Sequence, residues 1–296
     1  MVLGVLSLFM LEHLQNRHKT NNNDAKSSVM EVKYRLTGWK NISAVCFCSL
    51  VLILAFIIPV IQLSMYAINY IEQAWIIDVL EFSYNSFVIA LFTAVIAFLI
   101  ALTLNHNKRI NNHSINASCL KLSSSGYAIP GTVLAIGVLI PLTLMDTFAN
   151  DTLVDLGFGP IGLVFSGTVF AIICTHVVRF TAIANKTLDA SYQKISPSLD
   201  MAAKTLGSSD KALLRKVHLP LIRRSGLVAG LLIFVESMKE LPAALLLRPF
   251  DFQTLPTYVY QFASDEQLEL ASLGAIIIVL VGLVPLIFIN RSIDKK

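Results

Sequence analysis

Three ionisable residues, Glu236, Lys239 and Glu240, lie inside a long apolar segment of the chain. A charge at the centre of a membrane helix costs at least about 2.5–3.5 kcal/mol on insertion scales, so such residues usually have a function. Their i, i+3 and i+4 spacing predicts that all three share one helix face, where Lys239 could pair with either carboxylate. One interpretation is that this face lines a translocation path and offers hard oxygen contacts to a passing metal ion. The other is a salt-bridge cluster that joins helices, with the helix breaking at Pro242.

A second pattern is the polar, basic stretch DMAAKTLGSSDKALLRKVHLP, residues 200–220, which separates two apolar segments and so lies outside the lipid. It predicts a short helix, a turn with positive φ at Gly207, and a second amphipathic helix that ends at Pro220. Ala202 and Ala203 are small enough for another surface to approach the first helix closely. The second helix has an apolar stripe of Leu213, Leu214 and Val217, and leaves Lys211, Arg215 and Lys216 for polar contacts. We expect a structured hairpin that binds a partner; the alternative is an amphipathic helix lying on anionic lipid.

The composition determines which elements must position these residues. Of 296 residues, 55% are hydrophobic and 14% charged, and the mean hydropathy is +0.69. A soluble domain carries about 25% charged residues, so we expect an all-α integral membrane protein. Six apolar segments have the required length: about 42–70, 83–104, 124–146, 161–182, 226–247 and 271–290. Residues 1–11 are apolar but too short to span, so we interpret 1–40 as the end of a preceding helix plus a basic linker, followed by a six-span domain over 41–296.

Lysine and arginine alternate with acidic residues along the connections, which predicts the orientation. The linker, the second connection, the fourth connection and the C-terminus are basic. The other connections carry Glu72, Asp78 and Glu81; Asp146, Asp151 and Asp155; and Asp251, Asp265, Glu266 and Glu269. Both termini and the loop over about 195–224 are therefore predicted to be cytoplasmic.

The sequence contains no GxxxxGK[ST] phosphate loop, no HExxH and no GxSxG. We therefore predict no catalytic residue, no metal site and no cofactor bound by this chain. The small net charge of +4 gives no indication of nucleic-acid binding.

The hairpin resembles the "EAA" loop of permease subunits in binding-protein-dependent ABC importers: Glu-Ala-Ala, three residues, Gly, nine residues, Ile, any residue, Leu-Pro. Ala202, Ala203, Gly207, Val217, Leu219 and Pro220 match this spacing. Met201 stands at the position of the motif's glutamate, with Asp200 one residue earlier. The resemblance implies a six-span type I ABC importer permease core. It also implies that the hairpin is a coupling helix seated on cytoplasmic ABC ATPase subunits, which use the ATP.

A further set of segments resembles the ferric-iron permease branch of that family. It comprises residues 236–249, Thr254, Leu255, Tyr258, Tyr260, residues 126–137, and Tyr84, Asn85 and Ser86. The resemblance covers nearly all of 40–293 and implies that Glu236, Lys239 and Glu240 are candidates for a path taken by ferric iron. Members of this branch have two six-span halves in one chain. This sequence is similar to the second half, so we expect a split or truncated gene, or a start assigned too late.

The resemblance thus implies a permease component of the bacterial inner membrane. Its partners would be ATPase subunits, a periplasmic substrate-binding protein, a second permease half and the lipid bilayer. Related importers of thiamine, polyamine or phosphonate remain alternatives, as do a secondary transporter and a non-functional fragment.

Overall fold

The computed structural model describes residues 37–72, 76–111 and 114–293. The helix end predicted for residues 1–11 and nearly all of the linker after it lie outside the described residues. All regular structure in the described part is helical, as predicted. Within these described ranges, six helices are long and apolar enough to cross a membrane: Trp39–Asn69, Asp78–Ile110, Gly131–Asp155, Val169–Tyr192, Asp210–Met238 and Leu268–Ile287. The predicted number of spans is therefore confirmed.

The chain divides at Pro59 into two compact units. In the first, α2 (Trp39–Leu52) and the π-helix η1 (Ile53–Ile57) bury no side chain and continue directly into α3 (Ile58–Asn69). A helix that is apolar and exposed on every side suits a lipid environment or another chain. This run matches the predicted span 42–70.

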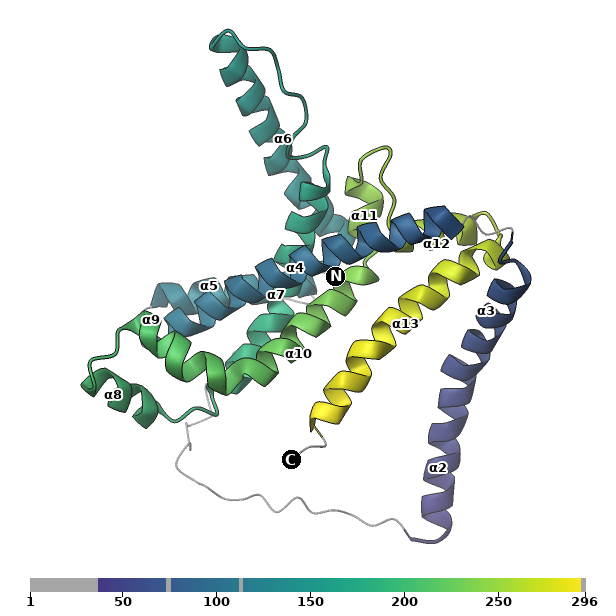
Figure 1. Cartoon of the computed structure of the whole chain (residues 1–296), viewed down its shortest axis with the longest axis horizontal. Coiled ribbons are helices and arrows are strands. Elements are labelled where there is room, and N and C mark those ends of the chain that lie inside the picture. Colours follow the sequence, from purple (N-terminus) through teal and green to yellow (C-terminus); the bar gives the residue numbers. More distant parts are fainter. Residues whose placement is uncertain (1–36, 73–75, 112–113, 294–296) are drawn as a thin grey trace. The chain divides into compact units, whose positions relative to one another are not determined.

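The core of the second unit is made by three helices, α4 (Ile76–Ile110), α7 (Val169–Tyr192) and α10 (Leu219–Met238). They pack side by side (Figure 1). Alanines supply much of the contact: Ala97, Ala101, Ala184 and Ala229 are fully buried. Small side chains let helix backbones approach closely, which is how membrane helices usually associate.

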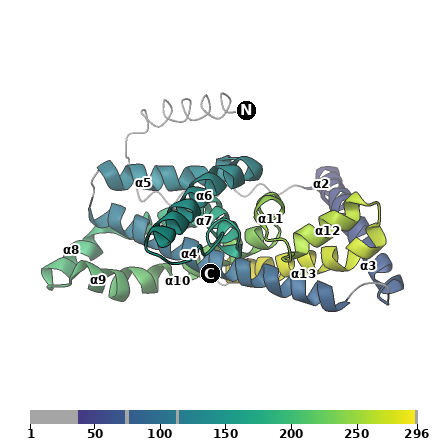
Figure 2. The same cartoon turned by 90° about the horizontal axis from the view of Figure 1, so that it is seen from above.

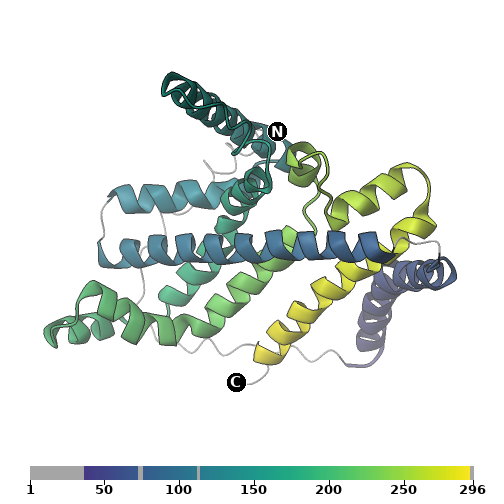
Figure 3. The same ribbon diagram turned by 45° about the horizontal axis from the view of Figure 1, so that its top comes forward.

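The remaining helices surround this core. They are α5 (Ser114–Ser125), the 3-10 turn η2 (Gly126–Ala128), α6 (Gly131–Asp155), α11 (Pro242–Leu247), α12 (Leu255–Ser264) and α13 (Leu268–Ile293). The segment α5 lies along α4 and α7 (Figure 3), and α11 packs against α6. Figure 2 shows α12 near one end of α4, and near the other end α8 (Pro197–Thr205) and α9 (Asp210–Leu213). The two ends of α4 therefore have different neighbouring helices.

The span predicted for 161–182 begins too early, because α7 starts at Val169. The side chain of Asp146 in α6 accepts hydrogen bonds from the backbone N–H groups of Val164, Phe165 and Ser166 at 2.9, 2.8 and 2.7 Å. Because these three N–H groups bond to a side-chain carboxylate and not to the carbonyl groups of a helix, residues 164–166 form a loop. The helix also continues to Tyr192, ten residues beyond its predicted end.

Two other predicted spans have shifted ends. The span 124–146 begins instead at Gly131, because Pro130 precedes it with ψ 138, an extended conformation. The predicted span 226–247 is interrupted: α10 ends at Met238 and α11 begins at Pro242, a break that only the salt-bridge interpretation had included. The spans 83–104 and 271–290 lie within α4 and α13.

Candidate functional site

The predicted hairpin is present and its turn is built as expected. The short helix α8 begins after Ser196, whose hydroxyl accepts from the N–H of Ser198 at 3.3 Å, and has Pro197 in its first turn. Gly207 has φ 79, which confirms the predicted positive φ. The N–H groups of Gly207 and Ser208 donate to the carbonyls of Lys204 and Ala203, both at 3.0 Å. This Schellman arrangement satisfies the last carbonyls of α8.

The prediction that Pro220 ends the second helix is wrong. The segment α9 passes through one π-helical turn, η3 (Leu214–His218), into α10 without a break, and Pro220 lies in the first turn of α10. Proline has no N–H to donate to the preceding turn, and here that preceding turn is the π-turn η3, where the helical bonding pattern already changes. The hairpin's second arm is therefore continuous with a membrane span.

The hairpin residues divide between an exposed and a buried side. Met201 is 63% exposed and Leu206 86%, and Ala202, Gly207, Leu219 and Pro220 are also exposed. Ala203 and Val217 are half-buried. In the predicted apolar stripe, Leu213 is buried and Leu214 packs against the α4–α7–α10 core. The stripe therefore packs within the chain, while the tip of the hairpin remains open.

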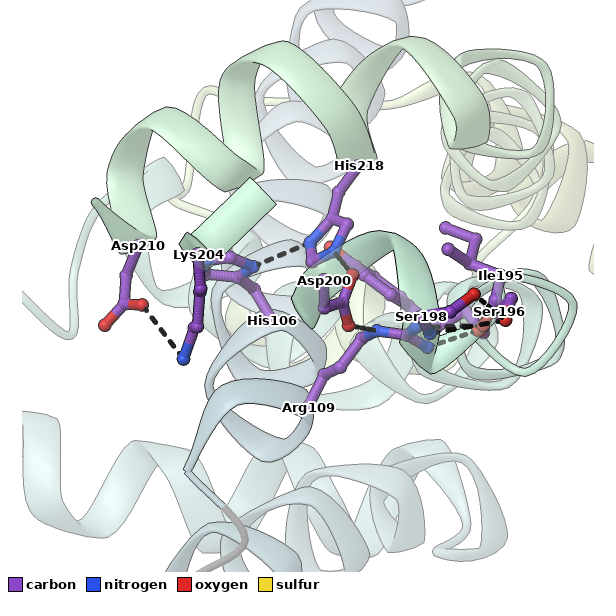
Figure 4. A network of polar contacts seen from close by, with 10 residues as sticks. His106, Arg109, Ile195, Ser196, Ser198, Asp200, Lys204, Asp210 and His218 are labelled. Carbon is purple, nitrogen blue, oxygen red and sulfur yellow. Dashed lines mark hydrogen bonds and ion pairs between the residues drawn. The ribbon is translucent and has the colours of Figure 1, made fainter. Parts of the chain in front are cut away.

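Asp200 differs from its neighbours on α8 because its carboxylate points into the chain (Figure 4). One oxygen accepts from Arg109 Nε at 2.6 Å and the other contacts His218 Nε2 at 2.9 Å. Burial raises the pKa of Asp200, but the hydrogen bonds from His218 and Arg109 outweigh it, so this pKa lies below its ordinary value. Asp200 is therefore ionised at neutral pH.

Arg109, at the end of α4, joins several elements at this point. Besides Asp200, it donates from its two terminal nitrogens to the carbonyls of Tyr192 at 2.7 Å and Ile195 at 2.9 Å. These carbonyls lie at and just beyond the C-terminal end of α7, where a positive charge is favourable. Sequence reasoning missed Arg109, since no local pattern pairs two residues 91 positions apart.

The intramembrane residues do not share one helix face, so that prediction is wrong. The helix α10 ends at Met238, and Lys239 is its C-cap residue. Lys239 pairs with Glu236 at 2.8 Å on the surface of the chain, whereas Glu240 turns away and pairs with Arg179 of α7 at 2.6 Å. Their roles therefore separate: Glu236 and Lys239 face outward, and Glu240 is only 9% exposed.

Arg179 is the second residue that the sequence did not reveal. Its guanidinium lies 5.8 Å from the ring centres of both Tyr127 and Phe180, in addition to its bond with Glu240. One turn earlier on α7, His176 Nδ1 lies 2.8 Å from the hydroxyl of Ser237. Two polar links thus connect α7 to the point where α10 breaks. Within the described ranges, no three His, Cys, Asp or Glu side chains form a group that could hold a metal ion.

Some known proteins are similar to this chain in sequence, and others are similar in fold. The chain is 28% identical over 254 residues to the Fe(3+)-transport system permease protein FbpB 2 of Haemophilus influenzae, covering 84% of this chain and 47% of that protein. It is 26% identical over 163 residues to PhnV of Salmonella typhimurium, named as a 2-aminoethylphosphonate transport system permease protein, covering 55% of each. It also superimposes on a chain of a bacterial alginate ABC transporter crystallised with its periplasmic protein. There the TM-score is 0.62 at 18% identity, over 86% of this chain and 96% of that chain.

The chain is therefore similar in sequence to permease proteins of bacterial transport systems. No protein-family model matches it. The chain spans about half the length of the curated relatives it matches. Its hairpin has the spacing of the EAA loop, with an exposed Met201 at the position of the motif's glutamate.

Proposed function

We propose that this chain is the membrane permease component of an ATP-driven ABC importer. The observation that carries the proposal is the hairpin, whose exposed tip includes apolar side chains and whose second arm continues directly into the apolar helix Asp210–Met238. The sequence has no phosphate loop, so the energy comes from separate cytoplasmic ATPase subunits that hold this tip. The exposed residues Met201, Ala202, Leu206 and Gly207 form the contact.

The proposed cargo is ferric iron. Its support is the similarity to the iron permease FbpB 2 along most of this chain and the partly exposed carboxylate of Glu236, a hard oxygen ligand that pairs with Lys239. The similarity to PhnV makes a phosphonate the second candidate.

The proposed assembly follows from the family and from the charge pattern. A second permease half completes the path, and a periplasmic binding protein delivers the cargo on the acidic outer face. The proposed orientation has both termini and the hairpin in the cytoplasm of a bacterium and the spans in its inner membrane; the basic connections support it.

Co-expression with the ATPase, second half and binding protein of an iron importer from the same genome tests this function. We expect the wild-type chain to co-purify with the ATPase and to support ATP-dependent uptake of radioactive iron into proteoliposomes. Gly207→Val should abolish co-purification, because a β-branched residue is strained at φ 79. Gly207→Asn is the matched control, because asparagine tolerates this conformation.

Equal co-purification and uptake with Gly207→Val would contradict the proposal. Uptake of 2-aminoethylphosphonate instead of iron would change the cargo and leave the ABC function intact. Uptake that needs no ATPase would identify a gradient-driven transporter.

A further inference from the structure

The attachment of α8 to the rest of the chain is unusual, because this helix buries no side chain. Hydrophobic packing therefore contributes little to its position. Apart from the chain itself at either end, α8 is held mainly by Asp200, whose two oxygens both bind groups of other elements. The other ion pair on α8, Lys204–Asp210 at 3.5 Å, is about half exposed on both sides and contributes little.

The groups around Asp200 form a single cluster, here called the Asp200 cluster: His106, Arg109, Asp200 and His218 (Figure 4). His218 is fully buried, and its Nδ1 lies 3.2 Å from Nδ1 of His106. An ionised carboxylate only accepts hydrogen bonds, so Nε2 of His218 carries a proton toward Asp200. Two imidazole nitrogens can form a hydrogen bond only if one of them is protonated, so one ring donates at Nδ1 and the other accepts at Nδ1. The bonds thus run in series from α4 through His218 to α8.

The Asp200 cluster reaches every core helix of the second unit. His106 and Arg109 belong to α4, and His218 leads directly into α10. Arg109 also binds the carbonyls of Tyr192 and Ile195 at the end of α7. A displacement of α8 changes all of these contacts together. The planar guanidinium of Arg109 and the carboxylate of Asp200 fix both the length and the direction of the hydrogen bonds between them.

We propose that Asp200 is a positioning residue that transmits movement of the hairpin to α4, α7 and α10, and that it is not a contact of the ATPase. This inference rests on the proposed function. It assigns Asp200 a role different from that of the exposed residues Met201, Ala202 and Gly207, which face the partner. Substitution of Asp200 should therefore separate ATP hydrolysis from import without releasing the ATPase.

The test compares Asp200→Asn and Arg109→Met in the complete transporter, reconstituted in proteoliposomes. We expect both variants to co-purify with the ATPase and to hydrolyse ATP, while the number of cargo ions imported per ATP falls about tenfold, a typical size for coupling between sites. Lys108→Met and Asp189→Asn are matched controls, since Lys108 is next to Arg109 and pairs with Asp189 on the surface at 2.8 Å. Both controls should import as the wild type does. The double variant of Asp200 and Arg109 should be no worse than either single one.

Several outcomes would overturn the proposal. Loss of the ATPase from Asp200→Asn but not from Arg109→Met would show that Asp200 contacts the ATPase directly. An unchanged number of cargo ions imported per ATP would show that Asp200 does not transmit movement of the hairpin. If Asp200→Asn does not accumulate in the membrane, Arg109→Lys is measured instead; it keeps the charge but cannot make all three bonds, and normal import by it would refute the inference. A wild-type chain that never binds the ATPase would refute the proposed function itself.

Discussion

Gly131, the first residue of α6, leaves no room for a side chain beside the Arg179–Glu240 ion pair. A Cβ at this position would overlap Arg179 Nη1 and would lie 2.8 Å from Glu240 Oε1 and 3.0 Å from Pro242 Cβ. Both ion-pair atoms end flexible side chains, but they lie 2.6 Å apart in a largely buried pair. Neither can move aside without weakening the bond between α7 and the α10–α11 break.

We therefore expect Gly131→Ala to lower the free energy of unfolding by about 1–3 kcal/mol, the usual cost of overpacking a core. Complete separation of the pair would set the upper limit at about 3–5 kcal/mol. Gly137→Ala is the matched control: it lies in the same helix and has no atom within 4 Å of its added Cβ. Alanine favours a helix over glycine by up to about 1 kcal/mol, so this variant should be neutral or stabilised.

Thermal unfolding of the purified protein in detergent measures both variants. Gly131→Ala should melt below the wild type and Gly137→Ala should not. In a Glu240→Ala background the cost of Gly131→Ala should shrink, because Arg179 is then free to move. If Gly131→Ala melts as high as the control, α6 does not begin against the ion pair. An undiminished cost in the Glu240→Ala background would place the clash at Pro242 instead.

Two further predictions concern the carboxylates. Glu240→Gln should destabilise the protein by about 3 kcal/mol or more, because it leaves Arg179 without its charged partner. Glu236→Gln should keep the melting temperature of the wild type and reduce import. Equal melting temperatures for the two variants would contradict the different roles assigned to these two carboxylates. Asp146→Asn should speed proteolysis within residues 156–168, because the charge that holds three N–H groups and the Ser166 hydroxyl is lost. The exposed Asp151→Asn is its control, and identical cleavage of the two variants would refute the role of Asp146.

The features that sequence predicted well are local ones. Gly207 could be placed in a turn because its neighbours on both sides predict helices and only glycine adopts positive φ at little cost. The break at Pro242 follows from the same kind of reasoning, since proline cannot continue a helix. Pro220 shows the limit of this reasoning, because the helix continues through it. The π-turn that precedes Pro220 is not indicated by any residue pattern.

The features that sequence did not predict depend on distant partners. Glu240 was expected either to pair with Lys239 on one helix face or to join helices in a salt-bridge cluster. It joins helices, but its partner Arg179 is 61 positions away and could not be named, and a shared helix face was excluded once α10 ended at Met238. The late start of α7 has a similar cause, because an acidic residue expected on the outer surface is buried and binds a loop 18 to 20 positions later. Apolar periodicity contains no information on either pairing.

The helix α7 connects the two charged clusters that the structure reveals. Arg109 binds the carbonyl of Tyr192 at its end, and Arg179 binds Glu240 beside the α10–α11 break. Arg179 and Tyr192 are 13 positions apart, a distance of about 20 Å along the continuous helix. Fully buried side chains such as Phe180 and Leu188 pack this stretch against its neighbours, so it moves as a rigid element. Substitutions in the Asp200 cluster and at the Arg179–Glu240 pair therefore act on the same helix from two points, one at the hairpin and one inside the membrane.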